Sequence, residues 1–324
     1  MRTRNFGRTG LRVSEIVFGG GYVGGLLIHG DDDTRLGTVR RALDAGVNWI
    51  DTAPAYGAGA SEEALGWILR EVEDQPYLST KVAIDPSRLD DIPGQIEKSL
   101  HASLTRLDRE SVDLLQLHNP IAAHPGAGAL GVAQVLGDVA AGLERMRAQG
   151  LTDFIGITAL GEAGAIREVL DSARFDSAQV YYNMINPSAA RPVADGWSGH
   201  DFSGVIDTCL THGVAMMAIR VLAAGVLATD VRHGREIVLT RGSDIAMEER
   251  RARAAFQAIG TRYGTRAQAA IRFVIANPEI SCAVVGLAAP AHLEEALGAA
   301  ESGPLPPEGL AALNRLYDTG FARL

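Results

Sequence analysis

Four polar side chains stand at or just beyond the ends of apolar segments that predict buried strands. Asp51 ends the segment VNWID, and Tyr56 follows it five residues later. Lys81 lies near the end of YLSTKV, and His118 follows VDLLQL. The C-terminal ends of parallel barrel strands meet at one face, so these groups are expected to converge there. Each also has an ordinary structural alternative. Asp51 could cap the next turn, and Tyr56 could be a half-buried aromatic residue. Lys81 could extend to solvent, and His118 could be a hydrogen-bonded histidine of the core.

Together the four residues predict a proton-transfer site for the reduction of a carbonyl group. A buried lysine is costly unless a carboxylate pairs with it, and Asp51 on the neighbouring strand is placed to do so. We expect the Lys81 ammonium to lower the pKa of the Tyr56 phenol toward the working range. We expect the imidazole of His118 to hydrogen-bond a substrate oxygen.

Short apolar segments alternate with amphipathic ones along the whole chain, which indicates repeated strand–helix units. The predicted strands span residues 15–19, 47–51, 77–82, 112–117, 154–158, 178–182, 214–219 and 282–285. Their continuous apolar character is typical of a parallel sheet covered on both faces. Helices are predicted at 34–44, 61–71, 93–106, 132–149 and 163–172, among others. Ser61 is expected to open the second of these, and Gly46, Gly150 and Gly213 are expected to follow helix ends.

This alternation predicts one α/β domain over residues 1–324, folded as a closed (β/α)8 TIM barrel. A doubly wound open sheet is the competing arrangement, but the GGGYVGG segment at 19–25 does not fit the glycine-rich phosphate turn of such folds. That segment is instead expected to be a loop at the barrel mouth, close to a ligand or to the chain itself. The preceding FGRTGLRVS predicts a hairpin that turns at Thr9-Gly10 and closes the barrel bottom.

Composition narrows the class of protein. The 324 residues are 47% hydrophobic and 21% charged, which excludes intrinsic disorder, and the net charge of −9 disfavours nucleic acid and anionic membranes as partners. Cys209 and Cys282 lack CxxC partners and are predicted to be buried reduced thiols. No secretory signal precedes the first strand, and the longest nearly apolar run, 16–28, is broken by glycines, so we expect a cytoplasmic protein without a membrane span.

The segment GVNWIDTAPAYGAGASEEALG, followed by LSTKV and VDLLQLHNP, resembles the aldo-keto reductase superfamily. That family has Asp-x4-Tyr after the second barrel strand, Lys at the third and His at the fourth. The likeness continues through GLTDFIGIT, AQVYYN, VAMMAIRVLAAGVL and RFVIANPEISCAVVGLAAPAHLEEAL, with some similarity to the L-galactose dehydrogenase branch. It implies hydride transfer between a nicotinamide and the carbonyl or alcohol carbon of an aldehyde, ketone or sugar. Tyr56 would be the general acid, Lys81 and Asp51 would tune it, and His118 would orient the carbonyl.

The resemblance also assigns candidate cofactor-binding residues. Thr158 and Gln179 match positions that contact the nicotinamide carboxamide, and Ile219 stands where many relatives carry a stacking aromatic ring. Arg220 would contact the pyrophosphate or a substrate anion, or form a salt bridge at the barrel rim. The further cofactor candidates are Gly20, Gly21, Leu222, Gly286 and Glu295. The cofactor is NAD(H) or NADP(H), and the absence of a basic residue in 286–292 favours NAD unless Arg241, Arg262 or Arg266 folds into the site.

Substrate choice is expected to lie in long mouth loops at 118–131, 183–201 and 227–243, with Tyr22, His29 and Trp197 as candidate wall residues. Trp197 has loop packing as its alternative role. A small carbonyl compound or sugar is the expected substrate; the oligomeric state and the physiological direction stay open. A nicotinamide-binding regulatory subunit with little turnover is an alternative function. A metal-dependent hydrolase built on His118, His124, His200 and Asp201 is a weaker one, because these residues lack ligand spacing.

Overall fold

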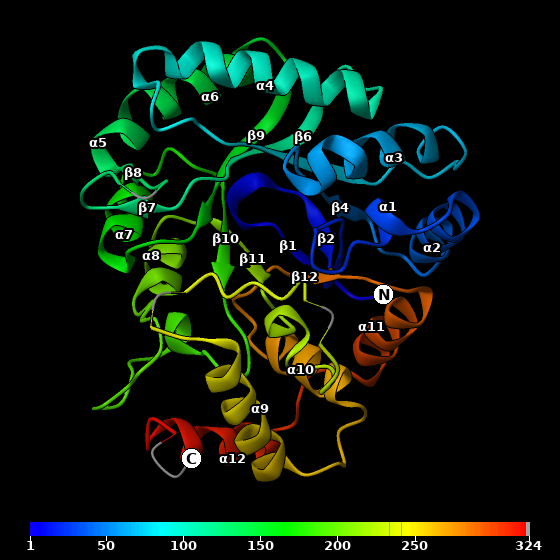
Figure 1. The fold of residues 1–324 in the computed structure, drawn as a ribbon, viewed down its shortest axis with the longest axis vertical. Coiled ribbons are helices and arrows are strands. Elements are labelled where there is room, and N and C mark those ends of the chain that lie inside the picture. The colour runs from blue at the N-terminus through cyan, green and yellow to red at the C-terminus, as the bar shows by residue number, and fades with distance from the viewer. Residues whose placement is uncertain (127, 233, 241, 322–324) are drawn as a thin grey trace.

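The computed structural model describes residues 1–126, 128–232, 234–240 and 242–321, and its centre is a closed barrel of eight parallel strands (Figure 1). The order around the barrel is β10-β11-β12-β3-β4-β5-β6-β9. Each predicted strand is present, with ends within two residues of the prediction, which confirms the TIM-barrel class. The strands are β3 (Ile16–Gly19), β4 (Trp49–Asp51), β5 (Tyr77–Val82), β6 (Val112–Leu117), β9 (Thr152–Ala159), β10 (Ser177–Tyr181), β11 (Ala215–Ile219) and β12 (Cys282–Gly286).

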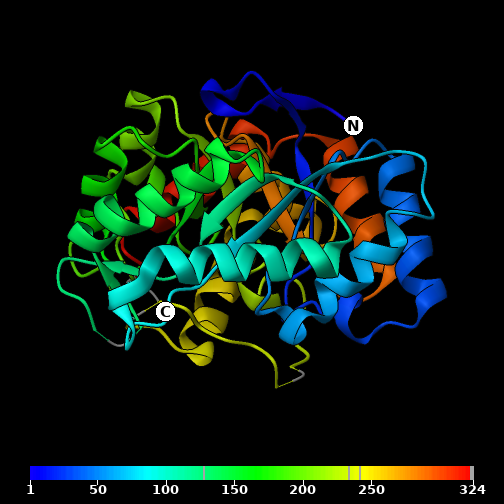
Figure 2. The same ribbon diagram turned by 90° about the horizontal axis from the view of Figure 1, so that it is seen from above.

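Helices surround the barrel and cover the outer face of its sheet (Figures 1 and 2). Their bounds are α1 (Leu26–His29), α2 (Asp32–Asp44), α3 (Ala60–Ile68), α4 (Ile92–Leu107), α5 (Val132–Gln134), α6 (Ala140–Ala148), α7 (Ala163–Asp171), α8 (Val205–Thr211), α9 (Ile245–Ile259), α10 (Arg266–Ile275), α11 (Pro290–Ser302) and α12 (Pro307–Tyr317). A small parallel pair, β7 (Ile121–Ala122) and β8 (Leu130–Gly131), lies in the loop after β6.

Some helix ends lie where the sequence predicts them, and others do not. Gly46, Gly150 and Gly213 have φ values of +85°, +74° and +63°, as expected of residues that follow helix ends. The prediction that Ser61 opens α3 is wrong: its hydroxyl lies 2.9 Å from that of Thr52 and donates to the Gly20 carbonyl instead. The single helix predicted at 132–149 is also wrong, because the chain kinks at Gly137 (φ −85°, ψ −107°) between α5 and α6.

The N-terminal hairpin of β1 (Thr3–Asn5) and β2 (Arg12–Ser14) covers the bottom of the barrel. Figure 2 shows it, in dark blue, at the opposite end of the molecule from the yellow segment that follows β11. Phe6 is fully buried and packs on Trp49, with ring centroids 4.7 Å apart. The connection is a six-residue loop whose 3-10 turn ends at Thr9, followed by Gly10 at φ +81°, so the predicted hairpin and its turn at Thr9-Gly10 are confirmed, as is the predicted closure.

Side chains fill the barrel interior in chemically distinct layers. The lowest layer is apolar and consists of Phe6, Val13, Val17, Trp49, Leu114, Ala215, Met217 and Cys282. Above it lies a buried polar layer that contains Asp51, Ser79, Lys81, Gln116, Ser177 and Gln179. Gly156 makes room in this layer, because a Cβ at that position would lie 2.2 Å from the Ser177 hydroxyl. The polar layer lies directly below the mouth of the barrel.

Two further predictions from the sequence are that the cysteines are buried reduced thiols and that the chain has no membrane span. Cys209 and Cys282 are both buried free thiols, and burial raises the pKa of Cys209 to about 12, so this thiol is protonated and unreactive at neutral pH. None of the helices in the described part of the chain combines the length and the apolar character that crossing a membrane requires.

Candidate active site

The four predicted reactive residues meet at the mouth of the barrel. Asp51 is the last residue of β4, Tyr56 lies in the 3-10 turn after it, Lys81 belongs to β5, and His118 directly follows β6. The Lys81 amine lies 5.0 Å from the centroid of the Tyr56 ring. The Tyr56 and His118 rings meet edge to face, with centroids 5.8 Å apart. A cavity of about 660 Å³ opens here, with Asp51, Tyr56 and His118 in its wall.

Asp51 and Lys81 form a buried ion pair under the cavity. The Lys81 Nζ atom donates to Asp51 Oδ2 at 2.7 Å and to the Thr52 carbonyl at 2.8 Å. The other carboxylate oxygen, Asp51 Oδ1, accepts from Ser79 Oγ at 2.7 Å and from Gln179 Nε2 at 2.9 Å. Because both carboxylate oxygens and the ammonium have partners, the pair is rigid and electrically compensated.

The electrostatics of Tyr56 differ from the sequence expectation. Burial raises the pKa of the Tyr56 phenol above its ordinary value, and the opposing charge of Lys81 does not offset this. Burial also works to lower the pKa of the Lys81 ammonium, but Asp51 and Tyr56 outweigh it and the pKa is raised. Burial, together with Lys81, lowers the pKa of His118 to about 4. At neutral pH the site therefore holds a protonated phenol, a charged lysine and a neutral imidazole.

Thr158 and Gln179 lie side by side on β9 and β10 and both line the cavity. Thr158 Oγ1 is buried and has no hydrogen-bond partner in the described residues. A buried hydroxyl of this kind is unfavourable unless a ligand supplies its partner. The Gln179 side chain is anchored to Asp51 through its amide nitrogen, so it joins the cavity wall to the buried ion pair. This pair of side chains fits the polar carboxamide of a nicotinamide.

The loop that follows β11 has an unusual backbone. Arg220, Ala223 and Ala224 have φ values of +60°, +45° and +55°, a region that non-glycine residues rarely adopt. Hydrogen bonds from Ala223 N–H to Arg220 O, at 2.8 Å, and from Leu227 N–H to Leu222 O, at 3.1 Å, hold this shape. The backbone N–H groups of Val221, Leu222 and Ala224 have no acceptor among the described residues, and all three residues line the cavity. Such unpaired N–H groups in a concave loop suit a phosphate group.

The remaining cofactor candidates divide into two groups. Gly21, Leu222, Gly286 and Glu295 line the cavity, whereas Gly20 does not: its Cα faces Ser61. In the loop after β12, the Ala288 N–H donates to His292 Nδ1 at 3.2 Å, and His292 also lines the cavity.

The arginines that were candidates for this region have other partners. Arg266 pairs with Asp230 at 2.8 Å, and the Arg262 guanidinium lies over the Tyr263 ring. Neither residue lines the cavity. Arg241 lies outside the described residues.

Among the predicted substrate residues, Tyr22 lines the cavity but His29 and Trp197 do not. His29 lies against Tyr22 with ring centroids 6.5 Å apart. Trp197 packs instead on Phe321, at 5.9 Å, and under the Arg251 guanidinium, at 4.7 Å, so its place in the fold corresponds to the alternative role in loop packing.

Sequence reasoning missed the apolar side of the mouth. Val231, Ile237 and Leu239 line the cavity, and each exposes a large part of its side chain. They belong to the segment 227–243, which was predicted as a substrate loop without naming these residues. The signal was present, because three large aliphatic residues in a polar surface loop indicate a binding wall.

The residues of the metal-hydrolase alternative do not gather. No group of three His, Cys, Asp or Glu side chains with metal-binding geometry exists in the described ranges. The His200 ring lies 2.6 Å from the Gly161 carbonyl, and Asp201 accepts from Ser203. This alternative therefore has no site in the described structure.

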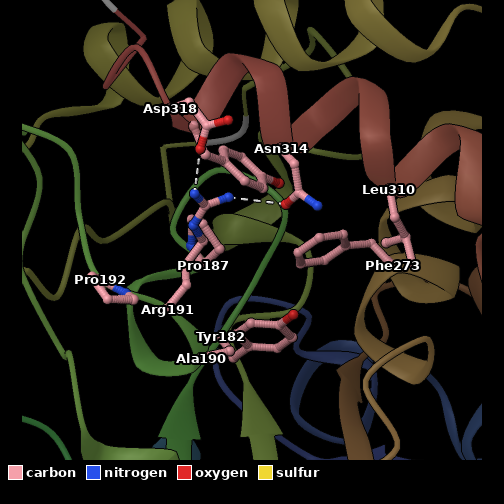
Figure 3. A pocket seen from close by; sticks show the side chains of 10 residues that line it. Tyr182, Pro187, Ala190, Arg191, Pro192, Phe273, Leu310, Asn314 and Asp318 are labelled. Atoms are coloured by element: carbon pink, nitrogen blue, oxygen red, sulfur yellow. Dashed lines mark hydrogen bonds and ion pairs between the residues drawn. The ribbon is translucent and has the colours of Figure 1, made fainter.

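A second cavity, of about 530 Å³, lies between the loop after β10, α10 and α12 (Figure 3). Figure 3 shows the Arg191 side chain reaching Asp318, at 2.6 Å, and Asn314, at 2.9 Å. The rings of Tyr182, Phe273 and Tyr317 form much of its wall. It contains none of the strand-end residues described above, so it is separate from the reactive group.

Comparison with known proteins agrees with this fold. L-galactose dehydrogenase from Arabidopsis thaliana is 27% identical over 299 residues, covering 91% of this chain and 87% of that protein. A probable voltage-gated potassium channel subunit beta from the same plant is 25% identical, covering 94% and 93%. The solved holo form of aldo-keto reductase AKR11C1 from Bacillus halodurans has the same fold, with a TM-score of 0.75 at 19% identity over 98% of this chain and 96% of that one. The family model for the aldo/keto reductase family matches residues 15–318, and the chain therefore belongs to this family.

Proposed function

We propose that the protein is a nicotinamide-dependent oxidoreductase that interconverts a carbonyl group and an alcohol. The observation that carries the proposal is the convergence of Tyr56, His118 and the buried Asp51–Lys81 pair on one cavity. The partly apolar cavity with a few polar groups at one end suits a small carbonyl compound or a sugar, and the relative L-galactose dehydrogenase fits this class.

In the proposed reaction, three side chains have distinct roles. When bound, the nicotinamide donates or accepts the hydride. Tyr56 is protonated at neutral pH and gives its phenolic proton to the carbonyl oxygen as the alcohol forms. The Lys81 ammonium, fixed by Asp51, stabilises the phenolate that remains. Neutral His118 hydrogen-bonds the carbonyl oxygen and orients it toward Tyr56.

The cofactor site belongs to the same proposal. Thr158 and Gln179 would hold the carboxamide, and the backbone of residues 221–224 would hold the pyrophosphate. Gly21, Gly286 and Glu295 would line the rest of the cofactor site. NAD is the expected cofactor, because residues 286–292 contain no Lys or Arg to hold a 2′-phosphate, and neither Arg262 nor Arg266 lines the cavity. Comparing kcat/KM for NADH and NADPH tests this choice, and a large preference for NADPH would contradict it.

Substitution of Tyr56 by phenylalanine tests the proposed reaction. General acid catalysis contributes about 10²–10⁴-fold, so Tyr56→Phe is expected to lower kcat by at least about 100-fold while NADH still binds. The readouts are NADH oxidation at 340 nm with a panel of aldehydes and NADH affinity by fluorescence titration. Tyr77→Phe, which alters a half-buried ring at the barrel bottom, is the matched control and is expected to retain activity. Full activity of Tyr56→Phe would show that Tyr56 is not the acid.

A regulatory subunit is the second candidate, because the channel-subunit relative matches over 94% of this chain. It predicts that NADH binds with no turnover on any aldehyde, ketone or sugar. Measured turnover that depends on Tyr56 would exclude this role as the sole function.

A further inference from the structure

Among the described residues, Arg220 is the one arginine that stands at the end of a barrel strand beside the reactive group. It directly follows β11, lines the cavity and interacts electrostatically with the Tyr56 phenol. Its backbone is fixed in the left-handed region, because its carbonyl accepts from Asn183 Nδ2 at 3.0 Å and from the Ala223 N–H. Such a conformation is unfavourable for a residue with a side chain and persists where the surroundings impose it, often at functional sites.

The guanidinium of Arg220 is only partly satisfied by the protein. Nη1 donates to the Ile237 carbonyl at 2.7 Å, and this neutral oxygen is its one hydrogen-bond acceptor among the described residues. Between described residues no ion pair within 4.0 Å includes Arg220, so the predicted rim salt bridge is absent there. A guanidinium has five N–H groups arranged to grip a carboxylate with two parallel hydrogen bonds.

The charges around Arg220 leave a positive excess. Glu248, on α9, is the carboxyl group whose charge acts on Arg220, and it also faces Arg251. Burial raises the pKa of Glu248 to about 7, so it carries only part of a negative charge at neutral pH. Two arginines thus share one partly ionised carboxyl group. Glu236 and Glu295 line the same cavity but do not contribute to the pKa of Arg220.

The cofactor does not require this guanidinium. The backbone N–H groups of Val221, Leu222 and Ala224 supply donors for a pyrophosphate in the same loop. Burial lowers the pKa of Arg220, and the opposing charges of Tyr181, Glu248 and Tyr56 do not offset it. A ligand anion at the reacting end of the cavity would supply the missing charge.

We propose that Arg220 determines specificity by binding a carboxylate on the carbonyl substrate, so that the preferred substrates are aldehydes or ketones that carry an acid group. This inference rests on the proposed function and adds the substrate class to it. Arg220 and Tyr56 would then hold the two ends of one molecule, the carboxylate at the arginine and the reacting carbonyl at the phenol.

The test compares acids with their neutral esters. The pairs are 4-carboxybenzaldehyde with methyl 4-formylbenzoate, and 4-oxobutanoate with its methyl ester. Each is reduced by the wild type, Arg220→Met and Arg220→Lys, with NADH. The wild type is expected to have at least a 10-fold higher kcat/KM for the acid of at least one pair. Arg220→Met is expected to lower kcat/KM for that acid by about 10–100-fold, the worth of a charged hydrogen-bonded pair, and to change that for the ester by less than about threefold. Arg220→Lys keeps the positive charge but cannot donate two parallel hydrogen bonds. Its kcat/KM for the acid is expected to lie between those of the wild type and Arg220→Met.

The controls separate the possible failures. Arg235→Met removes another cavity arginine and is expected to leave the acid-to-ester ratio unchanged. NADH affinity is expected to stay within about threefold in Arg220→Met; a large loss of affinity with no change in the ratio would overturn the proposal and assign Arg220 to the pyrophosphate. Equal turnover of acid and ester by the wild type overturns the substrate class alone. Absence of turnover with every aldehyde overturns the proposed function and this inference together. If Arg220→Met does not fold, the wild-type ratio and Arg220→Lys still decide.

Discussion

The buried pair of Asp51 and Lys81 allows a quantitative test of how the floor of the active site is built. The Lys81 side chain has no solvent exposure and that of Asp51 has 3%, and their charged atoms lie 2.7 Å apart. Removing one member of such a pair leaves a buried charge uncompensated, which typically costs about 3–5 kcal/mol of folding free energy. The two members are not equivalent, because their other partners differ.

In Lys81→Met the Asp51 carboxylate keeps the donors Ser79 and Gln179. We therefore expect the free energy of unfolding to fall by about 3 kcal/mol, the lower end of the range for a broken buried pair. In Asp51→Asn the ammonium loses its carboxylate, and the new amide nitrogen faces those same donors. We expect a loss of about 5 kcal/mol there. The double variant removes both charges and is expected to cost no more than Asp51→Asn alone, so the coupling energy is about 3 kcal/mol.

Urea unfolding, followed by tryptophan fluorescence and far-UV circular dichroism, measures the three variants against the wild type. Ser79→Ala, which removes one neutral donor to Asp51 and the acceptor of the buried Trp49 Nε1–H, is a control expected to cost about 1–3 kcal/mol. If the free-energy losses of the two single variants add in the double variant, the two charges are not coupled. That result would refute a buried Asp51–Lys81 ion pair.

Four further predictions concern stability. Phe6→Ala is expected to cost about 3–5 kcal/mol in urea unfolding, because a fully buried ring on Trp49 is lost, and a loss below about 1 kcal/mol would show that the hairpin does not plug the barrel. The folded-state pKa of His118, about 4, lies below its ordinary 6.5, so the unfolded chain binds the proton first and stability falls by up to about 3 kcal/mol as pH drops from 6.5 to 4; His118→Asn is expected to flatten that part of the profile. The pKa of Glu248, about 7, lies above its ordinary 4.5, so stability is instead lost by up to about 3 kcal/mol as pH rises from 4.5 through 7, and Glu248→Gln should remove this loss; an unchanged slope in either variant contradicts the assignment. Gly156→Ala is expected to lower Tm, because its Cβ meets the Ser177 hydroxyl at 2.2 Å and carbonyl at 2.8 Å, and a wild-type Tm would contradict the packing described.

The barrel and its reactive strand ends could be predicted because each depends on a local signal. A strand covered on both faces needs a continuous apolar run, and the residue that ends the run is then placed by the topology. Asp51, Lys81 and His118 follow from this rule directly. Tyr56 follows from its distance to Asp51, because the turn after β4 is short.

Other features depend on contacts that the sequence does not reveal. Ser61 has the composition of a helix cap, but a tertiary contact with Thr52 takes its hydroxyl. The direction of the Tyr56 pKa depends on whether burial or the Lys81 charge is larger, and only the depth of the ring decides that. Trp197 was a candidate for the cavity, but its loop turns toward α9 and Phe321.

The closed bottom of the barrel has a consequence for the supply of protons. Phe6, Trp49 and Leu114 form a dry layer beneath Asp51 and Lys81. In the proposed reaction, a proton that leaves Tyr56 would therefore be replaced from the mouth, the side on which the cavity opens. A substrate bound in the cavity would lie between the phenol and bulk water. In the proposed reaction, Tyr56 would then supply one proton per turnover and would be reprotonated after the product leaves.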